Sequence, residues 1–134
     1  GVLIATLHAW ESTSDRNLAD LCRRIRERRL FKTIELFEEE QSEPKARARA
    51  LELARDCASR AGYDPELHVG LDISTDTPFD DTKDNLVVVS SKGPARRPAD
   101  VSFLLSRLNG EALTRVRLIV PGELRDRIRQ ALSP

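Results

Sequence analysis

The first thirty residues carry apolar side chains at helical spacing. Residues 2–10 are apolar almost throughout, which predicts a short helix or the tail of a longer one. Polar residues 12–14 follow, with Ser12 and Asp15 at the spacing of a capping box, so this segment is predicted to cap a second helix over about 15–28. The predicted inward face of that helix consists of Leu18, Leu21, Cys22 and Ile25.

A strand and a long helix are predicted next. Residues 31–37 (FKTIELF) are rich in aromatic and β-branched side chains, as strands are. Ser42 is expected to cap the following helix, with Pro44 in its first turn and Gly62 at its end. The inward stripe is rich in alanine, so this helix can lie close to a sheet. Its members are Ala46, Ala50, Leu53, Ala54, Cys57 and Ala61.

Strict alternation of apolar and polar residues begins after this helix. Residues 66–73 (ELHVGLDI) predict a half-buried strand with His68 on its polar face. Residues 74–85 are polar and predict a long loop. Residues 86–90 (LVVVS) are apolar on both faces and predict a central strand.

The last third is predicted to contain a helix, a strand and a second helix. Asp100 is expected to cap the first helix, and Asn109-Gly110 to end it. Residues 114–120 (TRVRLIV) alternate as a strand does, and Pro121-Gly122 open the last helix. The apolar faces are Val101, Leu104, Leu105 and Leu108 in the first helix, Val116, Leu118 and Val120 in the strand, and Leu124, Ile128 and Leu132 in the last helix.

The order of these elements predicts the fold class. From residue 31 the order is β-α-β-β-α-β and a helix, which is typical of ferredoxin-like folds with two helices on one face of an antiparallel sheet. The predicted fold is therefore α+β, with two N-terminal helices, a ferredoxin-like βαββαβ antiparallel sheet and a C-terminal helix.

Composition and charge limit the function classes. The 134 residues are 40% hydrophobic and 33% charged, with 22 basic and 22 acidic side chains, so no net field attracts nucleic acid or membrane. No apolar run is long enough for a membrane span. Cys22 and Cys57 are too few for a disulfide framework and are expected to be reduced in a cytoplasmic protein. The sequence contains no methionine, which is expected after removal of an initiator or in a part of a longer chain.

No catalytic or metal-binding constellation is visible in the sequence. His8 and His68 have no second ligand at zinc spacing, and there is no phosphate loop or nucleophile elbow. An acidic stretch could hold a hard cation, but it lacks the spacing of an EF-hand, so a solvated loop is favoured. Its carboxylates are Asp72, Asp76, Asp80, Asp81 and Asp84. No catalytic residue, cofactor or metal site is expected within this chain.

The densest charge lies at residues 23–32, which hold six cations and a single acid, Glu27. Lys32 shares a strand face with Ile34. If that face is the core side, the ammonium needs an anionic partner, which Arg28 could also contact. In the alternative, the strand begins at Thr33 and Lys32 points to water.

Three stretches resemble the C-terminal part of HD-domain phosphohydrolases, in the branch of the deoxynucleoside triphosphate triphosphohydrolases. These are LCRRIRERRLFKTIEL, ARDCASRAGYDPELHVGLDISTDTPFDD and VSFLLSRLNGEALTRVRLIVPGELRDRI. The family's metal site requires a His…His-Asp…Asp motif that this sequence lacks. The resemblance implies that residues 1–30 are the last helices of a catalytic domain absent from this chain. It also implies that residues 31–134 are a non-catalytic accessory lobe, and that a divalent metal belongs to the absent domain.

The resemblance also implies a nucleotide site. The R-x-L-F-K motif, here from Arg28 to Lys32, helps bind an activating nucleotide at an assembly interface in regulated members of the family. By position, Arg28 and Lys32 would contact the nucleotide and Leu30 would lie beside its base or sugar. Arg96 and Arg97 would replace a further basic residue that is missing near Pro98. The implied partners are the catalytic domain, further copies of the protein and a guanosine or deoxyguanosine nucleotide.

A rival function is a free-standing ferredoxin-like domain that binds a protein or RNA through its basic patch. The sequence lacks the paired exposed aromatic residues with which such sheets stack RNA bases, so nucleic acid is the less favoured partner.

Overall fold

The computed structural model describes residues 1–83 and 86–133, apart from the side chains of Glu39 and Glu40. They form two compact units, one of residues 1–72 with 116–134 and the other of residues 73–115. None of the helices described is long and apolar enough to cross a membrane.

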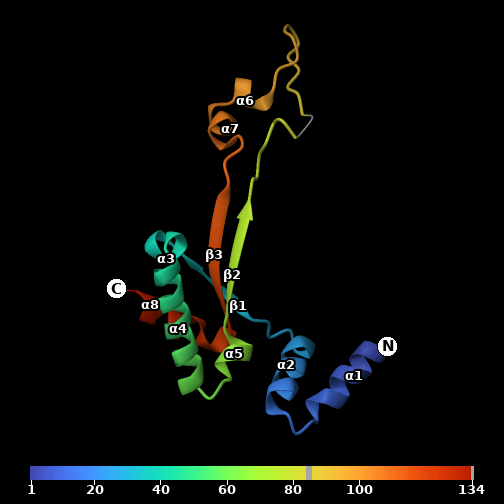
Figure 1. The fold of residues 1–134 in the computed structure, drawn as a ribbon. Coiled ribbons are helices and arrows are strands. Elements are labelled where there is room, and N and C mark those ends of the chain that lie inside the picture. The colour runs from blue at the N-terminus through green and yellow to red at the C-terminus, as the bar shows by residue number, and fades with distance from the viewer. Residues whose placement is uncertain (84–85, 134) are drawn as a thin grey trace. The chain divides into compact units, whose positions relative to one another are not determined.

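Both predicted N-terminal helices are present, as α1 (Val2–Glu11) and α2 (Arg16–Arg26) in Figure 1. The cap of α2 differs from the prediction. Asp15 Oδ1, not the Ser12 hydroxyl, accepts from the amides of Asn17 and Leu18, at 3.0 and 3.1 Å. Asp15 directly precedes the first helical residue, where a short acceptor reaches the free amides.

Three strands form the sheet: β1 (Lys32–Leu36), β2 (Gly70–Asp76) and β3 (Leu113–Val120). The order is β1-β3-β2, and β1 is antiparallel to β3 with Ile34 opposite Leu118. The alternation predicted for β3 is confirmed, because one of its faces is buried. Val116, Leu118 and Val120 are all fully buried.

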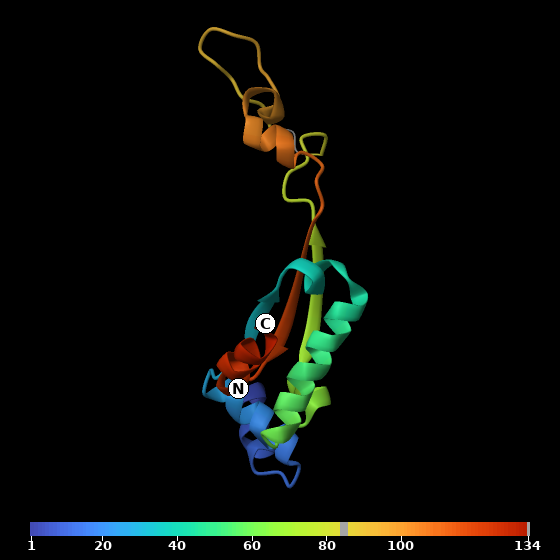
Figure 2. The same cartoon turned by 90° about the vertical axis from the view of Figure 1, so that its left-hand side faces the viewer.

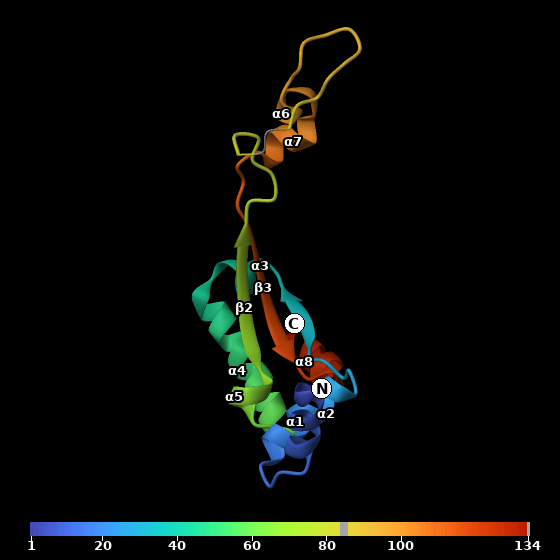
Figure 3. The ribbon, with the colours of Figure 1, turned by 90° about the vertical axis from the view of Figure 1, so that its right-hand side faces the viewer.

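Two helices, α4 (Pro44–Arg60) and α8 (Arg125–Leu132), cover one face of this sheet in the first unit (Figure 1, Figure 2). Figure 3 shows the strands from the other side. The alanine-rich face of α4 packs on the sheet, because small side chains permit a close approach. Its membership was predicted only in part, since Ala58 is buried, whereas Leu53 and Cys57 are half-buried and Ala61 is exposed. Its buried members are Ala46, Ala50, Ala54 and Ala58, and Leu124 and Ile128 complete the core from the C-terminal side.

Several ends of α4 and α8 were not predicted. Ser42 ends a short helix, α3 (Glu38–Ser42), and Glu43 precedes α4 without a capping side chain. Gly62 ends the α4 segment as predicted, since its φ of +85° is a conformation open to glycine. A 3-10 turn, η1 (Gly122–Leu124), leads into α8.

The strand prediction for residues 66–73 is only half correct. Pro65–His68 form a helical turn, α5, because Asp64 caps it by accepting from the amide of Glu66 at 3.0 Å. His68 is therefore buried at the end of α5 and does not lie on a polar strand face. The strand begins at Gly70 and extends to Asp76, into the predicted loop.

Residues 86–90, predicted as a central strand, form no strand. Val88 makes an isolated bridge to Arg96, and β3 takes the central place in the sheet. A strand with two apolar faces needs cover on both, and residues 86–90 are exposed. The α+β class with a three-stranded antiparallel sheet is confirmed, whereas the four-stranded ferredoxin-like order is not formed by the described residues.

The helix predicted after Asp100 is broken in two. Asp100 lies inside α6 (Pro98–Val101), and Ser102 caps α7 (Phe103–Leu108) by accepting from the amide of Leu105 at 3.4 Å. Asn109 and Gly110 end α7 as predicted, with Gly110 at a φ of +73°.

Candidate anion-binding site

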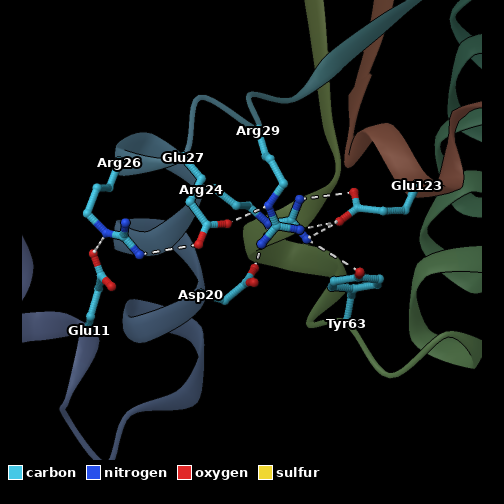
Figure 4. Close-up of polar contacts among 8 residues, drawn as sticks. All are labelled: Glu11, Asp20, Arg24, Arg26, Glu27, Arg29, Tyr63 and Glu123. Atoms are coloured by element: carbon cyan, nitrogen blue, oxygen red, sulfur yellow. Dashed lines mark hydrogen bonds and ion pairs between the residues drawn. The ribbon is translucent and has the colours of Figure 1, made fainter.

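The six cations of residues 23–32, the basic segment, form two groups of three. Arg24, Arg26 and Arg29 are held by carboxylates of the same unit, as Figure 4 shows. The other three make no side-chain hydrogen bond or ion pair with any side chain that the structure describes, and all are exposed. They are Arg23, Arg28 and Lys32.

Arg24 is a buried structural residue, with 3% of its surface exposed. Its two terminal nitrogens contact the two carboxylate oxygens of Glu123, each at 3.0 Å, and its Nε donates to Asp20 at 2.6 Å. Its guanidinium carbon lies 5.7 Å from the ring centre of Phe31 and 5.5 Å from that of Tyr63. This bidentate contact joins α2 to η1 across 99 positions of the sequence.

Arg26 and Arg29 extend these contacts along the surface. Arg26 donates to Glu11 of α1 at 2.6 Å and to Glu27 at 3.2 Å. Arg29 donates to Glu27 at 2.8 Å and to Glu123 at 3.4 Å. Because these side chains are partly exposed, each pair contributes little by itself. Together they form a continuous series of ion pairs from α1 through α2 to η1 (Figure 4).

His68 belongs to the same buried cluster. Its Nε2 lies 3.3 Å from Asp20 Oδ2, and its Nδ1 lies 3.0 Å from the carbonyl oxygen of Asp64. The Phe31 and Tyr63 rings flank it, at 5.8 and 5.1 Å between ring centres.

The network lowers the pKa of its carboxyl groups. Burial alone would raise the pKa of Asp20, but hydrogen bonds from Arg24 and His68 outweigh burial and lower it. The hydrogen bond from Arg24 lowers the pKa of Glu123 against a smaller opposing effect of burial. Burial would lower the pKa of Arg24, but hydrogen bonds from Glu123 and Asp20 raise it, so Arg24 stays charged.

Acid is expected to weaken this network. Asp20 and Glu123 have a lower pKa folded than unfolded, so their stabilisation is complete above the unfolded-state values near 4 and is lost as the pH falls through the folded values. The free energy of unfolding, measured in urea from about pH 6 to pH 3, should fall more steeply for the wild type than for the double variant Asp20→Asn/Glu123→Gln. Parallel profiles would contradict this assignment.

Arg28, Leu30 and Lys32 lie in and just after the turn between α2 and β1. Arg28 has a φ of +54°, and its amide donates to the carbonyl of Ile25 at 3.2 Å. Leu30 is exposed. Lys32 shares the face of Ile34 but is also exposed, because β1 begins there and only its later residues are covered. A partly dry Lys32 is therefore not observed. The alternative is correct in that Lys32 is exposed, but wrong in that the strand begins at Lys32 and not at Thr33.

Lys32 also passes close to the start of η1. A Cβ atom placed on Gly122 would lie 3.5 Å from Lys32 Cγ, so the stem of Lys32 lies along the backbone of this glycine. Lys32 belongs to the same unit as Arg28.

Arg96 and Arg97, the other predicted site residues, belong to the second unit. Both are exposed. The backbone of Arg96 exchanges two hydrogen bonds with that of Val88, at 2.8 and 3.0 Å, and Arg97 directly precedes α6. Arg96 and Arg97 therefore lie in a different unit from Arg28, Leu30 and Lys32.

The acidic stretch is not a metal site in the described residues, which contain no group of three possible ligands. Asp72 pairs with Arg117 at 2.6 Å, Asp80 accepts from Thr82, and Asp81 accepts from Asn109 at 2.9 Å. Asp84 lies outside the described residues. Cys22 is buried, Cys57 is half-buried, and both are free thiols, as predicted.

A groove of about 740 Å³ runs between β1 and α8, away from the predicted site residues. Glu35 and Glu38 line it opposite Arg125 and Arg129, so its charge is balanced.

Sequence analysis did not identify Arg24 as structural or Glu123 as its partner. One signal was present: Arg24 stands three positions after Leu21, so it lies next to the apolar stripe of α2 on the helix surface. Glu123 gave no signal, because its role depends on a contact between distant parts of the chain.

Comparison with known proteins gives the family. A family model described as "HD associated region" matches residues 4–133. The chain is 25% identical over 130 residues to the uncharacterized protein YwfO of Bacillus subtilis, a match that covers 92% of this chain and 29% of YwfO.

Two solved structures are similar. A phosphohydrolase from Bacteroides thetaiotaomicron has a TM-score of 0.60 and 20% identity, over 88% of this chain and 29% of that one. A hypothetical protein from Aquifex aeolicus has a TM-score of 0.44 and 18% identity, over 90% and 28%. The chain thus spans less than a third of each relative. Because the family match covers nearly all of its residues, the chain belongs to the HD-associated region family.

Proposed function

We propose that this chain is the non-catalytic accessory region of an HD-type phosphohydrolase, and that it serves assembly and binds a regulatory nucleotide. The observation that carries the nucleotide part is the division of the basic segment. Three of its arginines are neutralised by carboxylates, while Arg28 and Lys32 are exposed without a described partner at one turn.

The chemistry of this pair suits a phosphate group. Arg28 offers a planar fork of donors, and Lys32 offers a compact ammonium group that is four positions further along the chain. Glu27 precedes Arg28 in sequence, and Glu123 follows Gly122, against which Lys32 packs; both acids already pair with Arg26, Arg29 and Arg24. The turn therefore keeps two cations available, and exposed Leu30 lies between them in sequence to contact a base or sugar.

The accessory role is supported by the family and by the surface of α1. HD-associated regions are by description companions of HD domains, and one similar structure is named a phosphohydrolase. Val2, Leu3 and Ile4 of α1 are 59–86% exposed, which suits a surface that packs against another domain. The metal-dependent hydrolysis of phosphate esters would belong to that domain.

Binding of dGTP and GTP tests the nucleotide part. In isothermal titration of the full-length protein, Arg28→Ala and Lys32→Ala should each weaken binding about 10-fold or more, because a hydrogen bond to a charged group contributes roughly 1.5–3 kcal/mol. Arg23→Ala is the matched control, since Arg23 is also exposed without a described partner but lies on α2, outside the turn.

The same titration has a clear negative outcome. Unchanged affinity in both turn variants would exclude the nucleotide site. An equal loss of affinity in Arg23→Ala would show that binding depends on the general positive charge of the region and not on Arg28 and Lys32. The accessory role is tested separately by whether the region that precedes these residues in the full-length protein carries the metal-binding His-Asp motif.

A further inference from the structure

The groove between β1 and α8 follows a free edge of the sheet. β1 ends the order β1-β3-β2, so in the described part of the chain β3 pairs with only one of its two edges. The consecutive strand residues 33–36 line the groove, and Phe37 continues it. Successive side chains of a strand point to opposite faces of a sheet, so a hollow that all of these residues line lies along the edge and not over one face.

The backbone at this edge is open to a further strand. In antiparallel pairing, alternate residues of β1 direct their amide and carbonyl groups toward β3, and the remaining residues direct theirs away from it. The register runs without a bulge from Lys32, opposite Val120, to Leu36, opposite Val116, and no proline interrupts it. The groove holds about 740 Å³, within the range of roughly 300–1,000 Å³ that is typical of ligand sites. An extended segment can therefore bind here by adding to the sheet.

The α8 side of the groove carries two arginines that lack acidic partners. Arg125 and Arg129 are about one helical turn apart, and both line the groove. Neither side chain makes a hydrogen bond or ion pair with a side chain that the structure describes. Nε of Arg125 is also shielded from solvent and has no acceptor. Because buried donors are nearly always paired in folded proteins, this nitrogen indicates a place for an acceptor from outside the chain.

The acids that line the groove leave these arginines unpaired. Glu35 lies between Ile34 and Leu36 in β1, and the latter two are buried on the face that α8 covers. Glu35 therefore points to the opposite face of the sheet. Glu38 follows the strand and makes no ion pair with a side chain that the structure describes. The charge of the groove is balanced in total, but its α8 side presents two cations and the half-buried Leu132.

We propose that this groove binds an extended acidic segment of a partner protein, which adds to the sheet as a further strand beside β1. Along such a segment every second side chain points toward α8, where acidic side chains would accept from Arg125 and Arg129. An apolar side chain at the end of the segment would cover Leu132 and Phe37, which is 62% exposed. A small anion would satisfy the arginines but leave the open strand edge unused, so the groove as a whole fits a peptide.

Fluorescence anisotropy with the full-length protein tests the charge of the proposed ligand. The probe is a fluorescein-labelled peptide of alternating glutamate and valine, and the matched peptide has lysine in place of glutamate. Arg125→Ala and Arg129→Ala should each raise the dissociation constant of the glutamate peptide about 10-fold, the size of one charge-assisted hydrogen bond. Arg127→Ala is the control on the same helix and should leave the affinity unchanged, since Arg127 is exposed and does not line the groove.

A second pair of peptides tests the addition of a strand. N-methyl groups on alternate residues remove the amide donors of one edge of a strand and leave those of the other edge intact. One N-methylated form of the glutamate peptide should therefore lose binding. The other form, which is methylated at the remaining positions, should keep it.

Four results would overturn the proposal. They are no binding of the glutamate peptide, equal binding of the lysine peptide, unchanged affinity in both arginine variants, and equal behaviour of the two N-methylated forms. The site goes beyond the proposed function, and Arg28→Ala separates the two. This variant should bind the glutamate peptide normally, because Arg28 precedes β1 and does not line the groove, and a loss of peptide binding would also contradict the site.

Discussion

Replacement of Arg24 by alanine is expected to lower the free energy of unfolding by about 2–4 kcal/mol. Removal of one partner from a buried ion pair typically costs 3–5 kcal/mol, because the other charge is left without compensation. The lower range applies here, because Asp20 and Glu123 are 28% and 43% exposed and water can solvate part of their charge. Urea unfolding of the chain, followed by circular dichroism, measures the loss.

Two further variants show which property of Arg24 matters. Arg23→Ala is the matched control on the same helix. It should change stability by less than about 0.5 kcal/mol, since Arg23 is exposed without a described partner. Arg24→Lys keeps the charge but loses the bidentate contact with Glu123, and should fall between the two. If Arg24→Ala proved as mild as Arg23→Ala, the buried contacts would add nothing to stability.

The elements that sequence predicted correctly are those with a local pattern. The apolar periodicity of α2, the alanine stripe of α4 and the alternation of β3 each place one face inward without reference to the rest of the chain. These patterns determine the α+β class, because they fix the kind and order of the main elements.

The predictions were wrong where contacts with other parts of the chain determine the local structure. Residues 66–69 alternate like a strand, but the Asp64 cap and the burial of His68 among Asp20, Phe31 and Tyr63 make them a helical turn. Residues 86–90 have strand propensity, but in the part of the chain that the structure describes their pairing is limited to the bridge between Val88 and Arg96. Ile25 was placed on the inward face of α2, yet it is 55% exposed near the end of that helix.

The candidate site was predictable only in part. The sequence located the basic turn, and the resemblance singled out Arg28 and Lys32, but the pattern did not show which of the other cations pair with carboxylates. That division depends on Glu123, which contacts Arg24 across 99 positions. The structure shows that Arg24, Arg26 and Arg29 pair with carboxylates, whereas Arg28 and Lys32, which the resemblance had singled out, are exposed.

Replacement of a core residue of α8 is expected to lower the free energy of unfolding at least as much as the loss of Arg24. Ile128 of α8 is fully buried against the sheet, so Ile128→Ala is expected to lower the free energy of unfolding by about 2–5 kcal/mol. The loss combines the transfer of the removed carbons with the cavity left between α8 and the sheet. Ile25→Ala is the matched control, with an expected change below about 1 kcal/mol, and a similar loss in both variants would contradict the assigned core.

The double variant Arg24→Ala/Ile128→Ala shows whether the two contacts hold the same segment. Glu123 and Leu124 in η1 lie directly before α8, so Arg24 fixes its start through charge while Ile128 fixes its body through packing. If either single change already detaches η1 and α8 from the sheet, the double variant should lose less than the sum of the two. If the losses add, η1 and α8 are held independently. The α2 network would then serve mainly to join the N-terminal helices to the α+β core, beside the turn that carries Arg28 and Lys32.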